Sequence, residues 1–268
     1  MRPSSAATAG RPARVGRALL VVAHGSRDPR HAATVHALTG LVRARRPALR
    51  VTTAFLDFDT PTVREALHRL AAEGVAEVVV LPLLLTRAFH ARTDLPAVLD
   101  DVGALPLRMR RAAVLGPSPL LHAALERRLA QAGLRPEDRS STGVVLAFAG
   151  STDAAAIAQI ARTRQEWART GWCSVRPAAA SPSCRPAGVP GVVEAVRALR
   201  AGGARRVAVA PYVIAPGILP DRIFRAAHDG GAEVVAGVLG PAPELARLVL
   251  LRHDEASAPL TAGADASS

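Results

Sequence analysis

The stretch that decides the fold is Leu19-Leu20-Val21-Val22-Ala23-His24-Gly25-Ser26-Arg27. Its apolar run is far shorter than the roughly 20 residues that cross a bilayer, and its Val and Leu content predicts a buried parallel strand. The stretch from Val78 through Pro82 to His90 repeats this pattern. Each histidine follows at or just beyond a strand's carboxyl end, where open α/β sheets bind their ligands. Two imidazoles converging at one sheet edge suggest a metal.

Strands and helices alternate outward from these two stretches along the whole chain, which predicts βαβ units and a parallel sheet. Strands are expected at residues 18–23, 50–55, 77–84, 108–113, 143–147, 173–179, 206–210 and 232–236. Helices are expected at residues 31–45, 62–73, 94–102, 119–131, 153–169, 189–201, 220–229 and 244–252.

Short motifs of the first half return in the second. Val114-Leu115-Gly116-Pro117 is echoed by Val238-Leu239-Gly240-Pro241, and Gly25-Ser26 by Gly150-Ser151. The expected fold class is therefore α/β, with two duplicated doubly wound domains that each contain a parallel sheet. The expected parts are a disordered tail (1–17), a domain with the active site (18–132), a linker (133–142), a duplicated domain (143–254) and a second disordered tail (255–268).

The two copies differ at the histidines. When Gly25-Ser26 is aligned with Gly150-Ser151, Ala149 stands opposite His24. When the two strand-proline motifs are aligned, Leu219 stands opposite His90. An imidazole needed only for packing would more readily survive in both copies, so the chemistry is expected in the first half.

Composition excludes several classes of protein. The formal net charge is +12, yet the chain has no lysine, so neither a Walker A lysine nor a Schiff-base lysine is possible. Aromatic residues make up 3% of the chain and no basic block contains interleaved aromatics, so nucleic-acid binding is not expected. A polyanionic small molecule fits the charge better.

Cysteine spacing and hydropathy add two further expectations. Cys173 and Cys184 are too far apart for a CxxC site and too few for a disulfide framework, so packing is their expected role. The longest apolar run, from Val78 to Leu85, is too short for a membrane span, and no signal-peptide pattern opens the chain. A cytoplasmic location without a membrane partner is expected.

The candidate site consists of His24, His90 and a carboxylate, Asp57, that follows the second strand. Imidazole binds divalent Fe, Co, Ni and Zn and also accepts a proton near neutral pH. Two histidines leave coordination positions open, which suits a protein that gives its metal away. The alternatives are that the histidines cap backbone carbonyls and that Asp57 begins a helix. The other histidines are expected at the surface or in packing, at positions 31, 36, 68, 122, 228 and 253.

Four motifs together resemble a known family: Ala23-His24-Gly25-Ser26-Arg27, Ala54-Phe55-Leu56-Asp57, Leu81-Pro82-Leu83-Leu84-Leu85-Thr86-Arg87-Ala88-Phe89-His90, and Asp94-Leu95-Pro96. Their order and spacing are similar to those of sirohydrochlorin chelatases of the CbiX type, class II tetrapyrrole chelatases, in the long two-domain form. The resemblance implies ATP-independent insertion of ferrous iron or cobalt into sirohydrochlorin, in siroheme or cobalamin biosynthesis. It implies Fe2+ or Co2+ as the metal substrate, with no permanently bound cofactor and no iron–sulfur cluster.

The resemblance also implies roles for single residues. His24 would bind the metal and accept a proton, His90 would be the second metal ligand, and Asp57 would orient these groups or relay a proton while contacting the substrate. The family usually has glutamate at the position of Asp57, and the shorter aspartate has less reach. The macrocycle would be lined by Leu85, Thr86, Arg87, Ala88 and Phe89, and the arginines nearest to its carboxylates in sequence are Arg27, Arg87 and Arg92. The expected partner is one tetrapyrrole, and the chain would act as a monomer or homodimer.

Three other functions remain open at this point. A protein of the same fold would carry a tetrapyrrole or a metal without catalysis. A phosphatase would use His24 as its nucleophile, although no Arg-His-Gly arrangement or phosphate-binding glycine loop is present. A basic nucleic-acid-binding protein would lose affinity steeply as salt rises.

Overall fold

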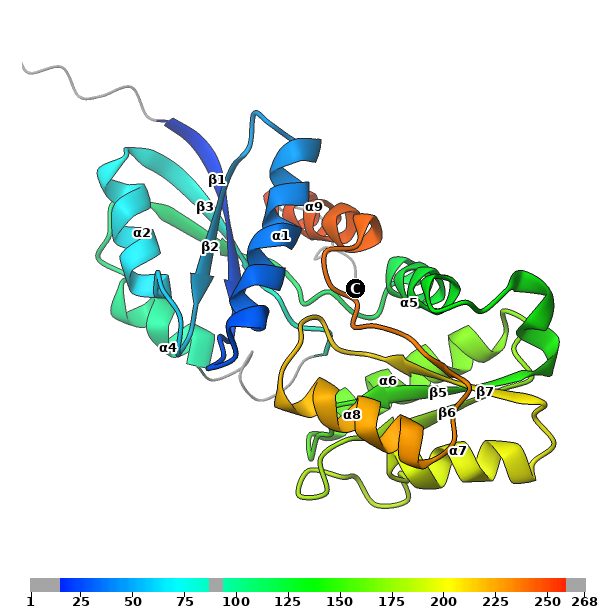
Figure 1. Cartoon of the computed structure of the whole chain (residues 1–268). Helices are drawn as coiled ribbons and strands as arrows, with labels where there is room; N and C mark the ends of the chain where they lie inside the picture. Colours follow the sequence, from blue (N-terminus) through cyan, green and yellow to red (C-terminus); the bar gives the residue numbers. More distant parts are fainter. Residues whose placement is uncertain (1–14, 87–93, 259–268) are drawn as a thin grey trace, which may run out of the picture.

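The computed structural model describes residues 15–86 and 94–258, and within them two parallel four-stranded sheets stand side by side (Figure 1). The first sheet has the order β2-β1-β3-β4 and the second the order β6-β5-β7-β8, so the two halves have one topology. The strands are β1 (Val15–Ala23), β2 (Arg50–Phe55), β3 (Val75–Pro82), β4 (Arg108–Arg111), β5 (Thr142–Phe148), β6 (Ser174–Ala179), β7 (Arg206–Pro211) and β8 (Val234–Val235). The predicted fold class, two duplicated α/β domains with parallel sheets, is confirmed.

Helices connect the strands in the predicted alternation. Their bounds are α1 (Pro29–Arg45), α2 (Val63–Ala72), α4 (Asp94–Asp101), α5 (Pro119–Gln131), the 3-10 helix η1 (Pro136–Ser141), α6 (Ala154–Ala168), α7 (Val192–Ala201), α8 (Ile218–Asp229) and α9 (Pro243–Ser257). Local side chains set several starts. Thr62 forms a capping box with Glu65 at the start of α2, and Asp28 caps α1 by accepting from the Arg30 N–H.

Two expectations about the ends of the chain and the cysteines are corrected. Residues 15–17, expected in a tail, belong to β1, because this strand pairs with β3 from Val15 opposite Val75 onward. Arg17 also forms an ion pair of 2.9 Å with Glu77 of that strand. Residues 255–257 belong to α9 and Ala258 follows it, whereas residues 1–14 and 259–268 lie outside the described residues. Cys173 and Cys184 are exposed free thiols, so they do not fill the core.

Each half contributes one helix that packs on the sheet of the other half. Helices α2 and α4 pack on one face of the first sheet, and α7 and α8 on one face of the second. The opposite face of the first sheet is covered by α1 and by α9, which comes from the end of the chain, whereas α5 packs against the second half (Figure 1). The two sequence repeats are therefore joined by a shared core.

The buried face of α9 contributes to that shared core. Leu245, Leu248 and Val249 are fully buried in one cluster with Leu19 and Val21 of β1. Each such side chain stabilises the fold by about 2 kcal/mol through burial. The same cluster continues into β5 of the second half, so one apolar layer holds the two sheets together.

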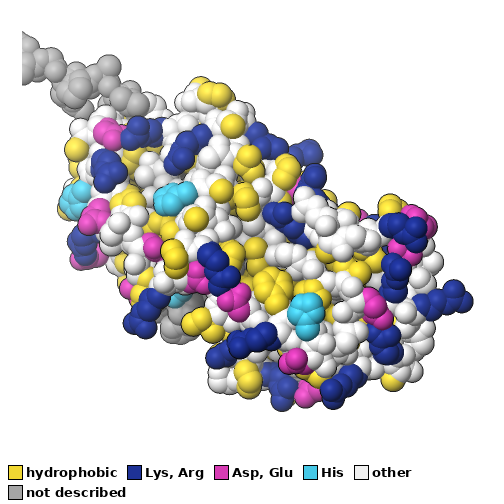
Figure 2. Space-filling model, in the orientation of Figure 1, with side chains coloured by type: hydrophobic (Ala, Val, Ile, Leu, Met, Phe, Trp, Pro, Cys, Tyr) yellow, Lys and Arg dark blue, Asp and Glu magenta, His cyan; other side chains and the backbone are white. Residues whose placement is uncertain are grey.

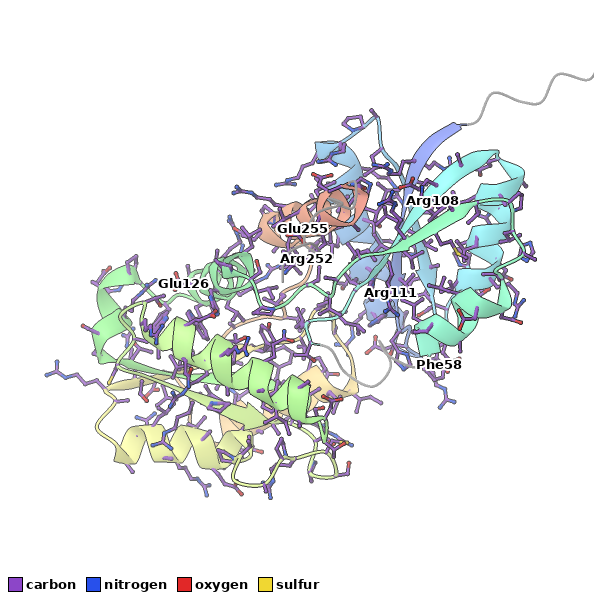
Figure 3. All side chains as sticks on the ribbon, turned by 180° about the vertical axis from the view of Figure 1, so that it is seen from behind. Phe58, Arg108, Arg111, Glu126, Arg252 and Glu255 are labelled. Atoms are coloured by element: carbon purple, nitrogen blue, oxygen red, sulfur yellow. The ribbon has the colours of Figure 1, made fainter. Side chains whose placement is uncertain are left out.

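A polar contact adds to this core. The guanidinium of Arg252 on α9 (Figure 3) donates hydrogen bonds to main-chain carbonyls between β4 and α5, those of Val114 at 3.0 Å, Leu115 at 2.9 Å and Pro117 at 3.2 Å. It also pairs with Glu255 at 2.8 Å. The last helix of the chain thus fixes the connection that leads out of the first sheet.

Charges on the surface are mixed. Arginine side chains are interspersed with acidic ones over both halves on the face seen in Figure 2. Many form ion pairs, such as Arg127 with Glu244 at 2.6 Å and Arg200 with Glu233 at 2.6 Å. Among the described residues, no helix combines the length and the apolar character that crossing a bilayer requires.

Candidate functional site

A cavity of about 770 Å³ lies where the carboxyl ends of the central strands of both sheets face each other. One wall comes from the loops after β1 and β3 and from the start of α1, in the first half. The opposite wall comes from the loops after β5 and β7 and from the start of α6, in the second half. The carboxyl edge predicted from the sequence is thus an inner surface between the halves.

His24 lies on the first wall, one residue beyond the end of β1. Its main-chain carbonyl accepts a hydrogen bond of 2.9 Å from the Asp57 N–H, which joins the loops after β1 and β2. Gly25 adopts a φ of 94°, and a Cβ there would overlap the carbonyl oxygen of Asp57. The tight Gly25 turn therefore sets the direction in which His24 leaves the strand.

The loop after His24 is held by side-chain acceptors. The Ser26 N–H donates to Oδ2 of Asp59 at 3.0 Å, and the Asp28 N–H donates to Oγ of Ser26 at 3.1 Å. Asp28 then caps α1. The first wall is thus a fixed turn that leads into the N-terminus of a helix.

The main chain of Asp57 forms a hydrogen bond with His24, whereas its carboxylate does not. Its side chain is exposed, its Oδ1 accepts a hydrogen bond of 2.8 Å from the Phe58 N–H, and the residue is not part of the cavity wall. Sequence reasoning missed Asp59, the carboxylate that bonds to the turn of the first wall. Its signal was only its position, two residues beyond Asp57.

Phe58 and Arg27 form a second pair that sequence reasoning did not assemble. Phe58 is 51% exposed and has a positive φ of 63°, so its ring stands at the edge of the cavity. The ring meets His24 edge-on, with 6.3 Å between centroids, and the guanidinium of Arg27 lies 5.1 Å from its centre. This cation–π contact holds a basic group on the wall of the cavity.

His31 also lies on the first wall, where the sequence suggested only a surface or packing role. It is half-buried in the first turn of α1. Burial lowers the pKa of His31, and a charged His24 lowers it further, whereas Asp59 and Asp28 oppose this shift. Ala156 stands at the equivalent position of the second half.

The loop after β3 supplies Leu85 and Thr86 to the same wall. The other predicted residues of this loop lie outside the described residues: Arg87, Ala88, Phe89, His90 and Arg92. Within residues 15–86 and 94–258, no group of three or more His, Cys, Asp or Glu side chains is arranged to hold a metal ion.

The opposite wall is mostly apolar. It contains Phe148, Ala149 and Ile160, and the loop after β7 from Tyr212 to Pro220. Burial raises the pKa of the Tyr212 hydroxyl. The imidazoles of the described residues that line the cavity therefore face an apolar surface across it.

An ion pair links the halves next to the cavity. The guanidinium of Arg30 on α1 contacts Oδ2 of Asp221 on α8 at 2.6 Å and also pairs with Asp28 at 2.6 Å. These groups are partly exposed, so the pair contributes little to stability. Its geometric effect is to tie the start of α1 to the start of α8.

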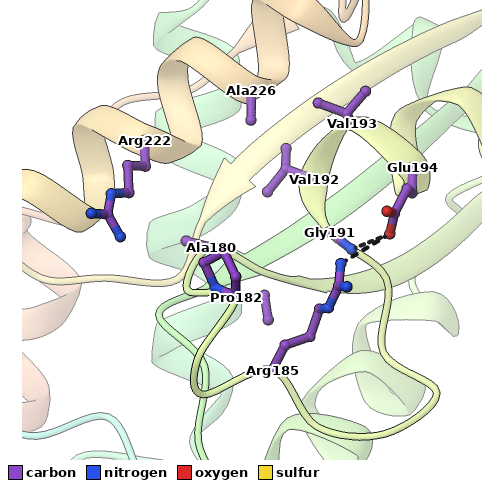
Figure 4. Close-up of a pocket in the computed structure, with 10 residues that line it drawn as sticks. Ala180, Pro182, Arg185, Gly191, Val192, Val193, Glu194, Arg222 and Ala226 are labelled. Carbon is purple, nitrogen blue, oxygen red and sulfur yellow. Dashed lines mark hydrogen bonds and ion pairs between the residues drawn. The ribbon is translucent and has the colours of Figure 1, made fainter.

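A smaller cavity, about 160 Å³, lies within the second half beside the start of α7 (Figure 4). Its acidic residue, Glu194, accepts from the Gly191 N–H at 2.7 Å and from Arg185 at 3.2 Å. No imidazole is among the residues that line it. Of these two cavities, the larger one is therefore the one lined by imidazoles.

Comparisons with known proteins agree with this architecture. The chain is 25% identical over 257 residues to the sirohydrochlorin cobaltochelatase of Priestia megaterium, an alignment that covers 89% of this chain and 79% of the relative. The structure of SirB from Bacillus subtilis with Fe3+ superposes with a TM-score of 0.77 at 23% identity, covering 90% of this chain and 96% of that one. A structure of CbiX, described as the terminal enzyme for biosynthesis of siroheme in denitrifying bacteria, gives 0.67 at 22% identity, covering 90% and 99%.

The family model named CbiX matches the chain twice, over residues 18–132 and 143–256. The two matches correspond to the two halves that the internal motifs predicted, and together they take in most of the sequence. The chain belongs to the CbiX family.

Proposed function

We propose that this protein inserts a divalent metal ion, ferrous iron or cobalt, into sirohydrochlorin without ATP. The observation that carries the proposal is the cavity between the halves, in which an imidazole-bearing wall faces an apolar wall. Its volume of about 770 Å³ lies in the range of small-molecule sites. Relatives named as sirohydrochlorin chelatases support the same substrate.

The macrocycle binds between the two walls. Its flat face packs on the apolar wall around Phe148 and Ile214, and its edge meets Leu85 and Thr86 on the first wall. Arg27, held over the Phe58 ring, pairs with a carboxylate arm of the substrate through a charge-assisted hydrogen bond. Arg87, Ala88 and Phe89 complete the substrate contacts as the family resemblance implies.

The chemistry exchanges two protons for one metal ion. Two pyrrole N–H bonds break, the four ring nitrogens bind the divalent ion, and two protons leave, so no redox partner or nucleotide is needed. His24 binds the incoming metal and accepts a proton, since imidazole does both. His90 is the second ligand in this proposal, and Asp57 orients the site through its link to the His24 main chain.

The metal is a substrate, so its site must release it. Protein ligands that leave coordination positions open allow ring nitrogens to replace them one by one. The duplication also provides both walls of the cavity within one chain, which favours a monomer. Iron and cobalt both suit imidazole ligands, and the pathway, siroheme or cobalamin, depends on which of the two is inserted.

A turnover experiment tests this function. Sirohydrochlorin in about fiftyfold excess over protein is mixed anaerobically with Fe2+ or Co2+, and the absorbance change is followed with and without protein. Conversion of many equivalents per protein, faster than in buffer, supports the chelatase. Binding of one equivalent with insertion no faster than in buffer supports the alternative, a tetrapyrrole or metal carrier of the same fold.

A further inference from the structure

One ring nitrogen of His31 faces the cavity, and the other is buried. Its Nδ1 is fully buried and has no hydrogen-bond partner among the described residues. Its Nε2 is accessible, and no described residue forms a hydrogen bond with it. Because His31 lines the cavity, Nε2 is the atom that a bound group can reach.

The surroundings of His31 keep its ring unprotonated at neutral pH. Burial is the main cause that lowers its pKa, and positive charge on His24 acts in the same direction. An unprotonated imidazole is the form that binds metals.

The two halves differ at the position of His31. Ala156 takes the place of His31 in the second half and lines the opposite wall of the same cavity. Its neighbour Ile160 corresponds to Val35 on α1, and both also line the cavity. The repeat therefore packs at this position without an imidazole, and the ring occurs only on the wall that carries His24.

We infer that His31 is a further metal-binding imidazole, which lies on the first wall with His24 and helps to hold the divalent ion before it enters the macrocycle. The binding itself follows from the residues, and the destination of the ion rests on the proposed function. Two imidazoles leave at least two positions open in a tetrahedral or octahedral ion. An ion held in this way is exchangeable, as a transferred ion must be.

Cobalt binding without tetrapyrrole tests the inference. Wild type, His31→Gln and His36→Gln are titrated with Co2+ at pH 7.5. His36 is the matched control, because it lies on the same helix and its ring also lies near that of Phe55. The ring centroids of His36 and Phe55 are 5.7 Å apart, and those of His31 and Phe55 are 6.5 Å apart. Unlike His31, His36 is exposed and lies outside the cavity. The affinity for Co2+ should fall by at least about 10-fold in His31→Gln and stay unchanged in His36→Gln.

Proton NMR of the cobalt-bound protein identifies the ligand directly. A His31 that binds through Nε2 carries its proton on the enclosed Nδ1, so wild type should give a hyperfine-shifted N–H signal that exchanges slowly with solvent. That signal should vanish in His31→Gln and remain in His36→Gln. If His31→Gln does not fold, His31→Asn is measured in its place, because the shifted signal is assigned to His31 only by its loss from a folded His31 variant.

Three results would overturn the inference: no Co2+ binding by wild type, no slowly exchanging shifted N–H, or equal affinities in all three proteins. Failure of the proposed function gives a different pattern. Wild type would then bind Co2+ with the His31 signal present, but would not convert sirohydrochlorin. Conversion by wild type together with wild-type cobalt binding in His31→Gln would instead keep the function and reject the role of His31.

Discussion

Gln159 of the second half donates a hydrogen bond of 2.6 Å from its Nε2 to the main-chain carbonyl of Leu85 in the first half. Gly116 packs against this pair, and a Cβ there would overlap the Leu85 carbonyl and the Gln159 amide, with the Tyr212 hydroxyl 3.0 Å away. Leu85 lines the cavity. A residue of the second half thus fixes a loop of the first wall, which carries His24 and His31.

Replacing Gln159 with leucine should destabilise the protein by about 1–3 kcal/mol, because the Leu85 carbonyl would lose its buried donor. The free energy of unfolding in urea measures this effect. Gln165→Leu is the control, since Gln165 is exposed on the same helix. Equal unfolding free energies for the two variants would show that the contact between the halves contributes nothing.

Two glycine substitutions should have opposite signs. Gly25→Ala should destabilise by more than about 1 kcal/mol, because the new Cβ would overlap the Asp57 carbonyl at a φ of 94°. Gly40→Ala, within α1 and with open space around it, should stabilise by about 0.5–1 kcal/mol. Thermal unfolding of both variants beside wild type measures the shifts, and a stable Gly25→Ala protein would refute the tight turn.

Because α9 packs against the first sheet, a substitution on its buried face should strongly destabilise the protein. Leu248→Ala should destabilise the protein by about 2–5 kcal/mol, because Leu248 is fully buried in the core shared by both halves. Leu251→Ala, at a position on the same helix that is 45% exposed, should cost less than about 1 kcal/mol. Similar losses in urea unfolding would contradict the placement of α9 against the first sheet.

Stability should fall on mild acidification. His122 of α5 stacks on Trp167 of α6 with 6.4 Å between ring centres, and burial lowers its pKa below the usual 6.5. Below pH 6.5 the unfolded chain therefore binds more protons than the folded one, and the free energy of unfolding decreases by at most about 1.4 kcal/mol per pH unit for this group.

The variant His122→Phe keeps the ring contact but cannot titrate. Its unfolding free energy should change less steeply than that of wild type between pH 6.5 and 5, measured in urea at several pH values. Some slope should remain, because burial lowers the pKa of His31 in the same direction. An unchanged slope would show that His122 is not protected from protons in the folded state.

Much of the fold follows from the sequence, because strand runs such as Val78 to Leu81 are continuous and apolar and the motifs of the two halves repeat. The strand at 50–55 and the helix at 119–131 have the predicted bounds. The exchange of α5 and α9 was not predictable, since both helices carry an apolar stripe that fits either sheet. Only the three-dimensional packing decides which sheet each one covers.

The candidate site was predictable where a residue follows a strand directly, as His24 does. No sequence pattern predicts that the Asp57 carboxylate turns to the Phe58 N–H, because local turn geometry decides this. His31 was missed because a histidine within a helix has no periodic signature. Its position in the cavity depends on how the start of α1 meets the second half.

The most direct test of the account compares metal insertion by wild type, His24→Ala, His90→Ala and His36→Ala, with excess sirohydrochlorin and Co2+ or Fe2+ under anaerobic conditions. Equal rates are expected for wild type and His36→Ala, and a loss of about 100-fold or more is expected in the His24→Ala and His90→Ala variants. A His24→Ala variant that converts sirohydrochlorin as fast as wild type would contradict the central claim that the first wall of the cavity carries the chemistry.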